Sequence, residues 1–431
     1  MPSTDFPIAE GITLHYLPDD RFKANVFTLN FIAPLEKESV SANALFPAVL
    51  LRGCEKYPTT AALSRRLSYL YGTAFSSRTA KRGEKLVFGF SLNLLSPSFV
   101  PDGSDLMGDV LDVLGDVLFH PLTEGDGFLP SFTEREKQNL IDTINANIND
   151  KVYYAHTRCI EEMCKDERFA VSENGSIEGV SACTPASLYK QYRYALTSYP
   201  IEIFFVGSCN AEKLASDLRS LFMGCERHPI GLPDTEFRRH AGNVKRITEP
   251  MTVSQGKLML GFRTELVAGE EGETAFLLFN AIFGDGVTSK LFTNVREKKS
   301  LCYDCSSRWN PLKGILTVFC GLETENRAVA EEAILEELKK TQDGMISDEE
   351  LESARLDLIN RFRSMADSAY AIESRTLSCL LIGKPADLDR AIKRLLSLTR
   401  EDVIAASRKL SLDTVYFLEG TLAGEKEEED A

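Results

Sequence analysis

Hydrophobic and polar positions alternate along two segments of the first half of the chain, residues 24–31 and 86–92. This period of two is typical of strands with one buried face. The apolar stretch 42–53 instead has the character of a buried helix. The same order returns in the second half, where a strand-like run over 257–262 precedes an apolar helix over 273–284. The pattern therefore predicts an internal repeat of strand and helix.

Two pairs of residues have the pattern of a helix N-terminus. Thr133 with Glu136, and Ser347 with Glu350, show the spacing of a capping box, and each pair opens a stretch with helical character. The two starts lie 347 − 133 = 214 residues apart. A capping role also accounts for Glu136 without any chemistry.

The last strand of each half, and the helix before it, are separated from their counterparts in the other half by nearly the same number of residues. Thr184 and Thr399 open further helices, 399 − 184 = 215 residues apart, and the apolar runs 201–207 and 414–420 come next. We therefore expect two homologous halves of roughly 210 residues. The predicted class is α+β: each half is an α/β sandwich with a mixed or antiparallel sheet and helices packed on one face.

A polar segment without periodicity separates the halves. It contains two prolines and a pair of adjacent arginines, which is typical of a linker. We expect an N-terminal half over 1–224, a linker over 225–248 and a C-terminal half over 249–431. The acidic run 425–430 is expected to be a solvated tail.

Composition excludes several classes of protein. The 431 residues include 49 Lys and Arg against 64 Asp and Glu, a net charge of −15, which argues against nucleic acid or an anionic membrane as partner. No run approaches the roughly 20 apolar residues of a membrane span. The first residues lack the pattern of a signal peptide. Ten scattered cysteines predict free thiols in a reducing cytoplasm.

Cys302 and Cys305 form the only C-x-x-C of the chain. Their flanks are typical of extended chain, in which residues three apart point to opposite faces. We therefore expect that the two sulfurs do not easily share a metal and that the pair is structural or incidental, although Cys320 lies fifteen residues further on.

Histidines are scarce. The five are His15, His120, His156, His228 and His240, and no two of them have the spacing of a local metal motif.

Further motifs occur in both halves. In the first half, R-G-C-E-K-Y-P (52–58) follows the apolar helix and precedes L-S-R-R-L-S-Y-L-Y-G (63–72). In the second half, G-V-T-S-K-L-F-T-N-V-R-E (286–297) is followed by Leu301 and Tyr303. Together these motifs resemble the pitrilysin/insulinase superfamily of inverted-zincin metallopeptidases, in the short two-domain branch that includes mitochondrial processing peptidase subunits. The resemblance covers nearly the whole chain.

Active members of that superfamily have H-x-x-E-H on the helix before the G-x-x-K-Y-P segment, and a further Glu ligand downstream. Two His four apart share one helix face and bind zinc, while the Glu activates the bound water. The matching positions here are Ala44, Pro47 and Ala48, and Thr143 takes the place of the distal Glu. The resemblance therefore implies a chain without zinc or any other cofactor of its own.

The second half retains residues that the superfamily uses, whereas the first half has lost its zinc-motif residues. Active pairs in the superfamily use an Arg and a Tyr of the noncatalytic half to hold the substrate backbone, and the matching residues here are Arg296 and Tyr303. The alternative is that Arg296 pairs with a nearby carboxylate and that Tyr303 packs. The family also adds the substrate as a strand to a sheet edge, which matches residues 74–80. There, Ser76 and Ser77 replace the usual Asn-Ala pair.

The favoured hypothesis is a noncatalytic, zinc-free subunit of a heterodimeric zinc metallopeptidase. A homologous partner would supply H-x-x-E-H and the zinc, this chain would contribute Arg296 and Tyr303, and short or unfolded peptides would be the substrates. Hydrolase activity is then expected only with the partner. The alternative is a homodimeric peptide-binding or scaffold protein without a proteolytic role. A third possibility, an autonomous zinc peptidase, predicts stoichiometric zinc in the purified protein.

Overall fold

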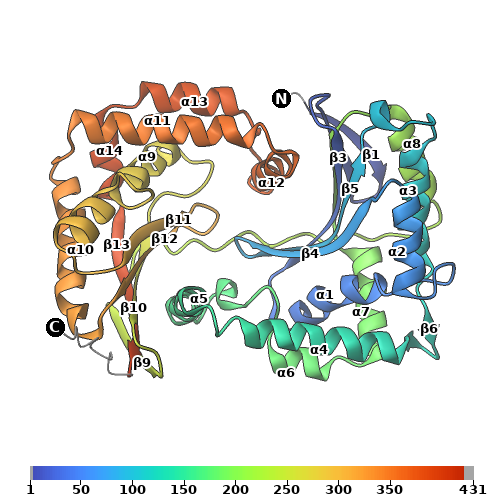
Figure 1. Cartoon of the computed structure of the whole chain (residues 1–431), viewed down its shortest axis with the longest axis horizontal. Coiled ribbons are helices and arrows are strands. Elements are labelled where there is room, and N and C mark those ends of the chain that lie inside the picture. Colours follow the sequence, from blue (N-terminus) through green and yellow to red (C-terminus); the bar gives the residue numbers. More distant parts are fainter. Residues whose placement is uncertain (1–2, 422–431) are drawn as a thin grey trace, which may run out of the picture. The chain divides into compact units, whose positions relative to one another are not determined.

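The computed structural model describes residues 3–421, so the predicted acidic tail lies outside the described residues. The chain forms two compact units (Figure 1). The first contains residues 1–146, 171–235 and 365–381, and the second contains 147–170, 236–364 and 382–431. Each unit thus includes one segment from the opposite half of the sequence, residues 365–381 in the first unit and 147–170 in the second. We call these two the exchanged segments. The compact units and the sequence halves are two different divisions of the chain.

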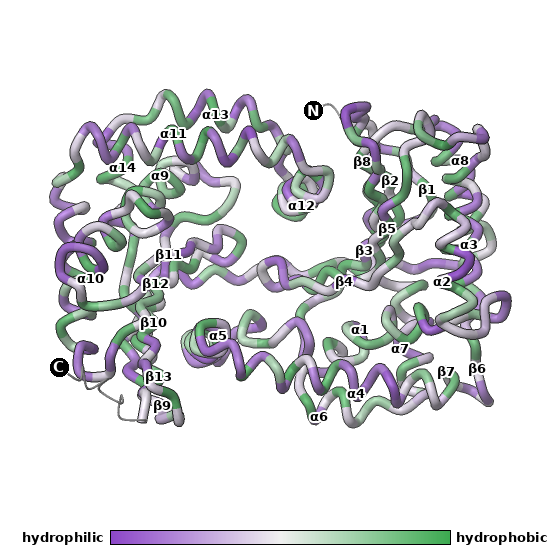
Figure 2. The backbone as a smooth tube through the Cα atoms, in the orientation of Figure 1, coloured by the Kyte–Doolittle hydropathy of each residue, from purple (hydrophilic) through white to green (hydrophobic). Residues whose placement is uncertain are grey.

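The first unit is built on a six-stranded mixed sheet. In spatial order its strands are β1 (Thr4–Ala9), β2 (Ile12–Pro18), β8 (Ile201–Gly207), β3 (Ala24–Pro34), β5 (Lys85–Leu95) and β4 (Ala74–Arg82). Neighbours are antiparallel except β2 and β8, which are parallel. β3, β5 and β8 are buried along most of their length and are correspondingly hydrophobic (Figure 2).

One face of this sheet carries the main core and most helices of the unit. Phe46 packs edge-on against Phe31 and Phe88 of the sheet, with ring centroids 5.9 and 5.5 Å away. The helices are α1 (Lys37–Leu50), α2 (Thr60–Tyr69), α3 (Leu106–Phe119), α4 (Pro130–Ala146), α6 (Ile177–Ala182), α7 (Pro185–Ser198) and α8 (Ala211–Leu221). Short elements complete the unit: η1 (Pro97–Phe99) and the hairpin of β6 (Thr123–Glu124) and β7 (Gly127–Phe128).

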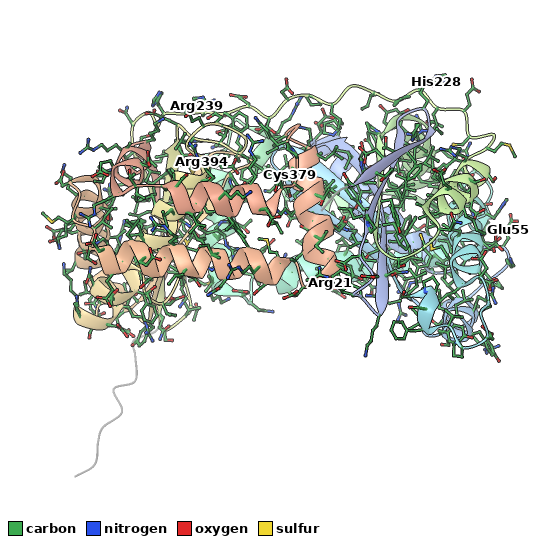
Figure 3. The ribbon with its side chains drawn as sticks, turned by 90° about the horizontal axis from the view of Figure 1, so that it is seen from above. Arg21, Glu55, His228, Arg239, Cys379 and Arg394 are labelled. Atoms are coloured by element: carbon green, nitrogen blue, oxygen red, sulfur yellow. The ribbon has the colours of Figure 1, made fainter. Side chains whose placement is uncertain are left out.

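The opposite face of the first sheet is covered by α12 (Ala369–Leu380), which comes from the second half of the sequence. Its Ile372 and Leu377 pack with Phe204 of the sheet. Near its start, Arg21 donates a hydrogen bond to the main-chain oxygen of Ala366 (2.7 Å), and Figure 3 shows Arg21 beside this end of the helix. The exchanged segment is therefore held by both apolar and polar contacts.

The second unit is built on a five-stranded mixed sheet. Its spatial order is β11 (Asp304–Asn310), β12 (Ile315–Leu322), β10 (Gly256–Thr264), β13 (Leu410–Gly420) and β9 (Lys245–Met251). Only β13 and β9 are parallel. The helical elements are α5 (Lys151–Met163), η2 (Arg168–Ala170), α9 (Glu273–Phe283), η3 (Leu291–Lys298), η4 (Thr324–Asn326), α10 (Arg327–Gln342), α11 (Asp348–Met365), α13 (Leu388–Ser397) and α14 (Arg400–Ser407).

The exchanged segment of this unit contributes α5, which packs on β10 and β13. Just after α5, the carboxylate of Glu167 is fully buried between Arg263 (2.6 Å) and Lys313 (2.7 Å). Burial alone would raise the pKa of Glu167, but the hydrogen bonds from Arg263 and Lys313 outweigh it, so the pKa is lowered. The carboxylate is thus held in its charged form at neutral pH.

The predicted α+β class with mixed sheets is confirmed. The predicted strand 201–207 is β8, and the apolar helix expected over 273–284 is α9. In addition, each sheet has its second face covered by a single exchanged helix. The capping box at Ser347 is confirmed, because its backbone nitrogen donates to Glu350 (2.8 Å) while its hydroxyl accepts from the Glu350 nitrogen (3.1 Å).

The capping box predicted at Thr133 is wrong. α4 begins at Pro130, so Thr133 lies inside the helix and its hydroxyl donates to the main-chain oxygen of Leu129. The side chain of Glu136 instead forms an ion pair with Arg52.

The segment expected to link the halves has no helix or strand between residues 225 and 244. Arg227 is buried in the first unit, where its guanidinium donates to the main-chain oxygens of Glu10 (2.8 Å) and Tyr199 (2.6 Å). Arg239, labelled in Figure 3, pairs with Glu270 of the second unit (2.6 Å). No helix within residues 3–421 has the length and hydropathy needed to cross a bilayer.

Candidate functional site

The positions that match the zinc motif lie on α1 of the first unit. Ala44 and Ala48 are half-buried, and Pro47 is buried inside the helix, where it cannot donate the usual backbone hydrogen bond to residue 43. The neighbouring Asn43 is buried and faces α7, because its amide oxygen accepts from Gln191 (2.8 Å). The side chains in this stretch of α1 therefore pack against neighbouring elements.

The fourth position lies on α4, which packs against α1. Thr143 is exposed, and its hydroxyl donates to the main-chain oxygen of Asn139 (2.9 Å). Seven residues earlier, about two helical turns, the carboxylate of Glu136 accepts from Arg52 and from the Asn139 side chain (3.1 Å). Since Arg52 lies two residues after the end of α1, this ion pair joins the end of α1 to α4.

These four residues do not fit the zinc ion that the superfamily implies. Zinc in proteins is bound by imidazole, thiolate or carboxylate groups, whereas α1 presents two methyl groups and a proline ring at these positions. Among residues 3–421, a single group of three or more His, Cys, Asp or Glu side chains could reach one ion, and it lies in the second unit.

The segment matched to the family's substrate strand is β4. β4 is an edge strand, since it pairs with β5 alone in the six-stranded sheet. Ser76 and Ser77 are exposed on it, while Arg78 is tied to Glu373 (2.9 Å). The structure thus places this segment at the edge that strand addition requires.

The residues carried over from the second-half motif lie at η3 and at the entrance to β11. η3 is a π-helix, a rare form that occurs frequently at functional sites. Its start is held to α11 by an ion pair between Lys290 and Glu350 (2.6 Å), and its middle to α10 by a hydrogen bond from Asn294 to Glu337 (2.7 Å). Ser300 then adopts a left-handed conformation (φ 50°), which turns the chain back toward β11.

The structure brings Arg296 and Tyr303 together. The Arg296 Nε donates to the main-chain oxygen of Tyr303 (2.8 Å), and its guanidinium lies 4.5 Å from the centre of the Phe292 ring. Within the described part of the chain, no acceptor binds the two terminal nitrogens of Arg296. The contact that fixes Arg296 is therefore a backbone oxygen and not a carboxylate.

Tyr303 projects from the surface with 57% of its area exposed. Its hydroxyl donates to Glu323 Oε1 (2.6 Å), and this hydrogen bond raises the pKa of Tyr303. Glu323 follows β12 directly. Sequence reasoning missed Glu323, because it lies twenty residues from Tyr303 and only the pairing of β11 with β12 brings them together.

The expectation that the C-x-x-C sulfurs lie apart is wrong. The sulfurs of Cys302, Cys305 and Cys320 all lie within 4.8 Å of one another. β11 begins at Asp304, so Cys302 precedes the strand and its side chain does not follow strand alternation. Hydrogen bonds from Cys305 and Cys320 lower the pKa of the Cys302 thiol, and the charge of Arg296 adds to this effect.

Comparison with known proteins identifies the family. The model described as "Peptidase M16 inactive domain" matches residues 182–358. "Probable inactive metalloprotease YmfF" of Bacillus subtilis (strain 168) is 32% identical over 411 residues, which are 95% of this chain and 96% of that protein. "Uncharacterized zinc protease YmxG" of the same organism is 24% identical over 305 residues, 70% of this chain and 72% of that protein.

The fold has a close counterpart among solved structures. The crystal structure of a conserved protein from Enterococcus faecalis V583 matches with a TM-score of 0.91 and 27% identity, covering 97% of this chain and 98% of that one. Its likeness extends over both compact units. The relative that is 32% identical over nearly its whole length confirms the resemblance drawn from the motifs. The chain therefore belongs to the M16 peptidase family of the pitrilysin/insulinase superfamily, as an inactive member that lacks the zinc motif.

Proposed function

We propose that this chain is the zinc-free subunit of a heterodimeric zinc metallopeptidase and contributes peptide binding to the partner's active site. One observation carries the proposal. The four positions of the zinc motif are occupied by residues that cannot replace its ligands, whereas Arg296 and Tyr303 lie together on an exposed surface. The partner supplies H-x-x-E-H and zinc, and the substrates are short or unfolded peptides.

The pair has hydrogen-bonding groups that suit a peptide unit. The terminal nitrogens of Arg296 are donors for a substrate carbonyl oxygen. Because the Tyr303 hydroxyl donates its proton to Glu323, its oxygen remains an acceptor for a substrate N–H. Groups fixed in this way hold a peptide backbone in one orientation, which is how a noncatalytic residue accelerates a reaction on a neighbouring zinc ion.

The relatives are consistent with a division of labour between two chains. Bacillus subtilis has one relative named an inactive metalloprotease and another named a zinc protease. All ten cysteines of this chain are free thiols, which supports a reducing cytoplasm as the compartment. We therefore propose that the partner is a zinc-bearing M16 relative from the same genome.

The test uses the full chain mixed with such a zinc-bearing relative and a library of short peptides. Neither chain alone is expected to match the mixture in peptide cleavage. Replacing Arg296 by Ala is expected to lower kcat/KM of the mixture by about 100-fold, the effect of removing one charged group that orients the reacting peptide. Arg308→Ala is the matched control, because Arg308 is an exposed arginine of β11.

Two results would overturn this proposal. Equal loss in the Arg296→Ala and Arg308→Ala mixtures would remove the specific role of Arg296. A chain that forms a stable homodimer by light scattering, and leaves the activity of every zinc-bearing relative unchanged, would establish the alternative of a scaffold or peptide-binding protein.

A further inference from the structure

Three cysteines that are distributed over two strands and a loop meet in the second unit. β11 and β12 pair with Cys305 directly opposite Cys320, and opposed residues of an antiparallel pair project to the same face. Cys302 joins them from the loop after η3, where the left-handed turn at Ser300 redirects the chain. Cys305 and Cys320 are buried, and Cys302 is half-buried.

The spacing of the sulfurs suits one four-coordinate ion. All three sulfurs lie within 4.8 Å of one another. Around zinc, with a metal–sulfur distance of about 2.3 Å, tetrahedral ligands lie about 3.8 Å apart. Small rotations of the three side chains therefore suffice to bring each sulfur into contact with a shared ion.

We propose that Cys302, Cys305 and Cys320 bind one thiophilic cation, Zn²⁺ or Cu⁺, as three thiolate ligands. Sulfur donors select these ions over Mg²⁺ or Ca²⁺, which require oxygen. Cys302 is the most accessible of the three, so the fourth coordination position opens on its side of the cluster. This site is separate from the α1 and α4 positions of the superfamily's zinc, which belong to the other unit.

The surrounding charges favour such a complex. Three thiolates around a divalent ion carry a net charge of −1, which needs a nearby positive group. Two cations act on the cluster, Arg296 on Cys302 and Lys257 on Cys320, against one carboxylate, Asp304, which acts on Cys320. The two are therefore placed to offset the negative charge of the loaded site.

A disulfide is the alternative to a metal ion at these residues, but it involves only two of the three sulfurs. It joins two sulfurs at about 2.05 Å and leaves the third thiol unused. Its formation also removes two electrons and two protons, which requires an oxidant. A cation engages all three sulfurs without any redox step, and so accounts for the whole cluster.

The bound ion would stabilise the substrate-binding pair. Cys302 is adjacent to Tyr303, whose main-chain oxygen holds Arg296. Binding Cys302 to β11 and β12 restrains this loop at one more point. The metal site does not depend on the proposed heterodimer, because the chain supplies all three ligands by itself.

The experiment measures metal uptake by the full, reduced chain. Metal-free protein is incubated with excess ZnCl₂, desalted and analysed for zinc, and a second sample is loaded with Co²⁺ to detect thiolate-to-cobalt absorption. We expect about one zinc ion per chain. Cys302→Ser is expected to weaken binding at least about 100-fold, because losing a direct ligand costs no less than losing a supporting residue. Cys209→Ser, a half-buried thiol of the first unit, is the control.

Cys302 lies in a loop, so its variant is expected to fold, which circular dichroism checks. Zinc is also expected to slow hydrogen exchange over residues 300–305 in the wild-type chain. Uptake of Cu⁺ in competition with zinc would identify the other thiophilic ion at the same ligands. The proposal is wrong if the wild-type chain takes up no metal, if Cys302→Ser binds as well as wild type, or if removing the reductant yields a disulfide among these residues without metal uptake.

Discussion

Each of the two units has a mixed sheet with helices, but the units differ at the positions matched to the superfamily's functional residues. In each sheet one of the two edge strands follows a helical element: α2 precedes β4 in the first unit, and η3 precedes β11 in the second. In the first unit, α1 and α4 have two alanines, a proline and a threonine at the positions matched to the zinc motif. In the second, the half-buried Arg296 donates a hydrogen bond to the main-chain oxygen of the exposed Tyr303. The two units therefore differ in the side chains that occupy the positions matched to the superfamily's functional residues.

The largest expected effect comes from restoring the missing ligands. The variant Ala44→His, Pro47→Glu, Ala48→His and Thr143→Glu places the motif of the active relatives on α1 and α4. In a Cys302→Ser background we expect it to bind one zinc with a Kd of about 1 μM or tighter, equivalent to about 8 kcal/mol. Calorimetry measures the affinity, and the same variant without Thr143→Glu is the control. A folded variant that binds no zinc would show that these positions do not converge on one ion.

A smaller but still large effect is expected at the exchanged segment of the second unit. Glu167→Ala would leave Lys313 and Arg263 buried without their shared carboxylate, although Arg263 keeps Asp413 (3.0 Å). We expect a loss of about 3–5 kcal/mol in the free energy of unfolding, measured by urea denaturation. The exposed Glu332→Ala is the control. A change below about 1 kcal/mol would contradict a structural role for this ion group.

The corresponding carboxylate of the first unit is Glu373 on α12. It accepts from Arg78 (2.9 Å) and from Thr28 (3.0 Å), but the Arg78 side chain is 20% exposed and can recover water contacts. Glu373→Ala is therefore expected to cost about 2–3 kcal/mol, less than Glu167→Ala. Urea denaturation of the two variants side by side checks the order. The reverse order would mean that burial of the partner cation does not control the cost.

The smallest effect concerns the buried histidine of the first unit. His15 lies between Glu202 (2.8 Å) and Asp5 (2.9 Å). Burial alone would lower its pKa, but the hydrogen bonds to Glu202 and Asp5 prevail and raise it. Its stabilising contribution is therefore fully present below pH 6.5 and is lost as pH rises through the folded pKa.

We expect His15→Gln to lower the free energy of unfolding by about 1–2 kcal/mol at pH 6, and by less at pH 9, since Asp5 is partly solvated. Denaturation curves at the two pH values test this difference. His120→Gln, at the end of α3, serves as a histidine control. An equal loss at both pH values would show that the charge of His15 contributes nothing.

Local sequence patterns predicted the helices and strands whose formation depends mainly on residues close together in the sequence. The apolar runs gave β8 and α9 almost to the residue, and Ser347 with Glu350 formed the expected cap. The prediction at Thr133 was wrong although the pattern was the same, because the helix there begins three residues earlier and Arg52 takes the carboxylate of Glu136. A capping motif alone therefore does not specify a helix start, since Glu350 completes its cap while also pairing with Lys290, whereas Glu136 pairs with Arg52 inside α4.

The sequence by itself determined the family, the α+β class and the replacement of the zinc ligands, because these depend on the identity and order of residues along the chain. Only the tertiary structure decided which helix covers the second face of each sheet, that Glu323 holds Tyr303, and that three cysteines meet. Those contacts join residues that are far apart in sequence or lie at a bend. They are created by strand pairing and turn geometry, which cannot be derived from the local hydrophobic periodicity of the sequence.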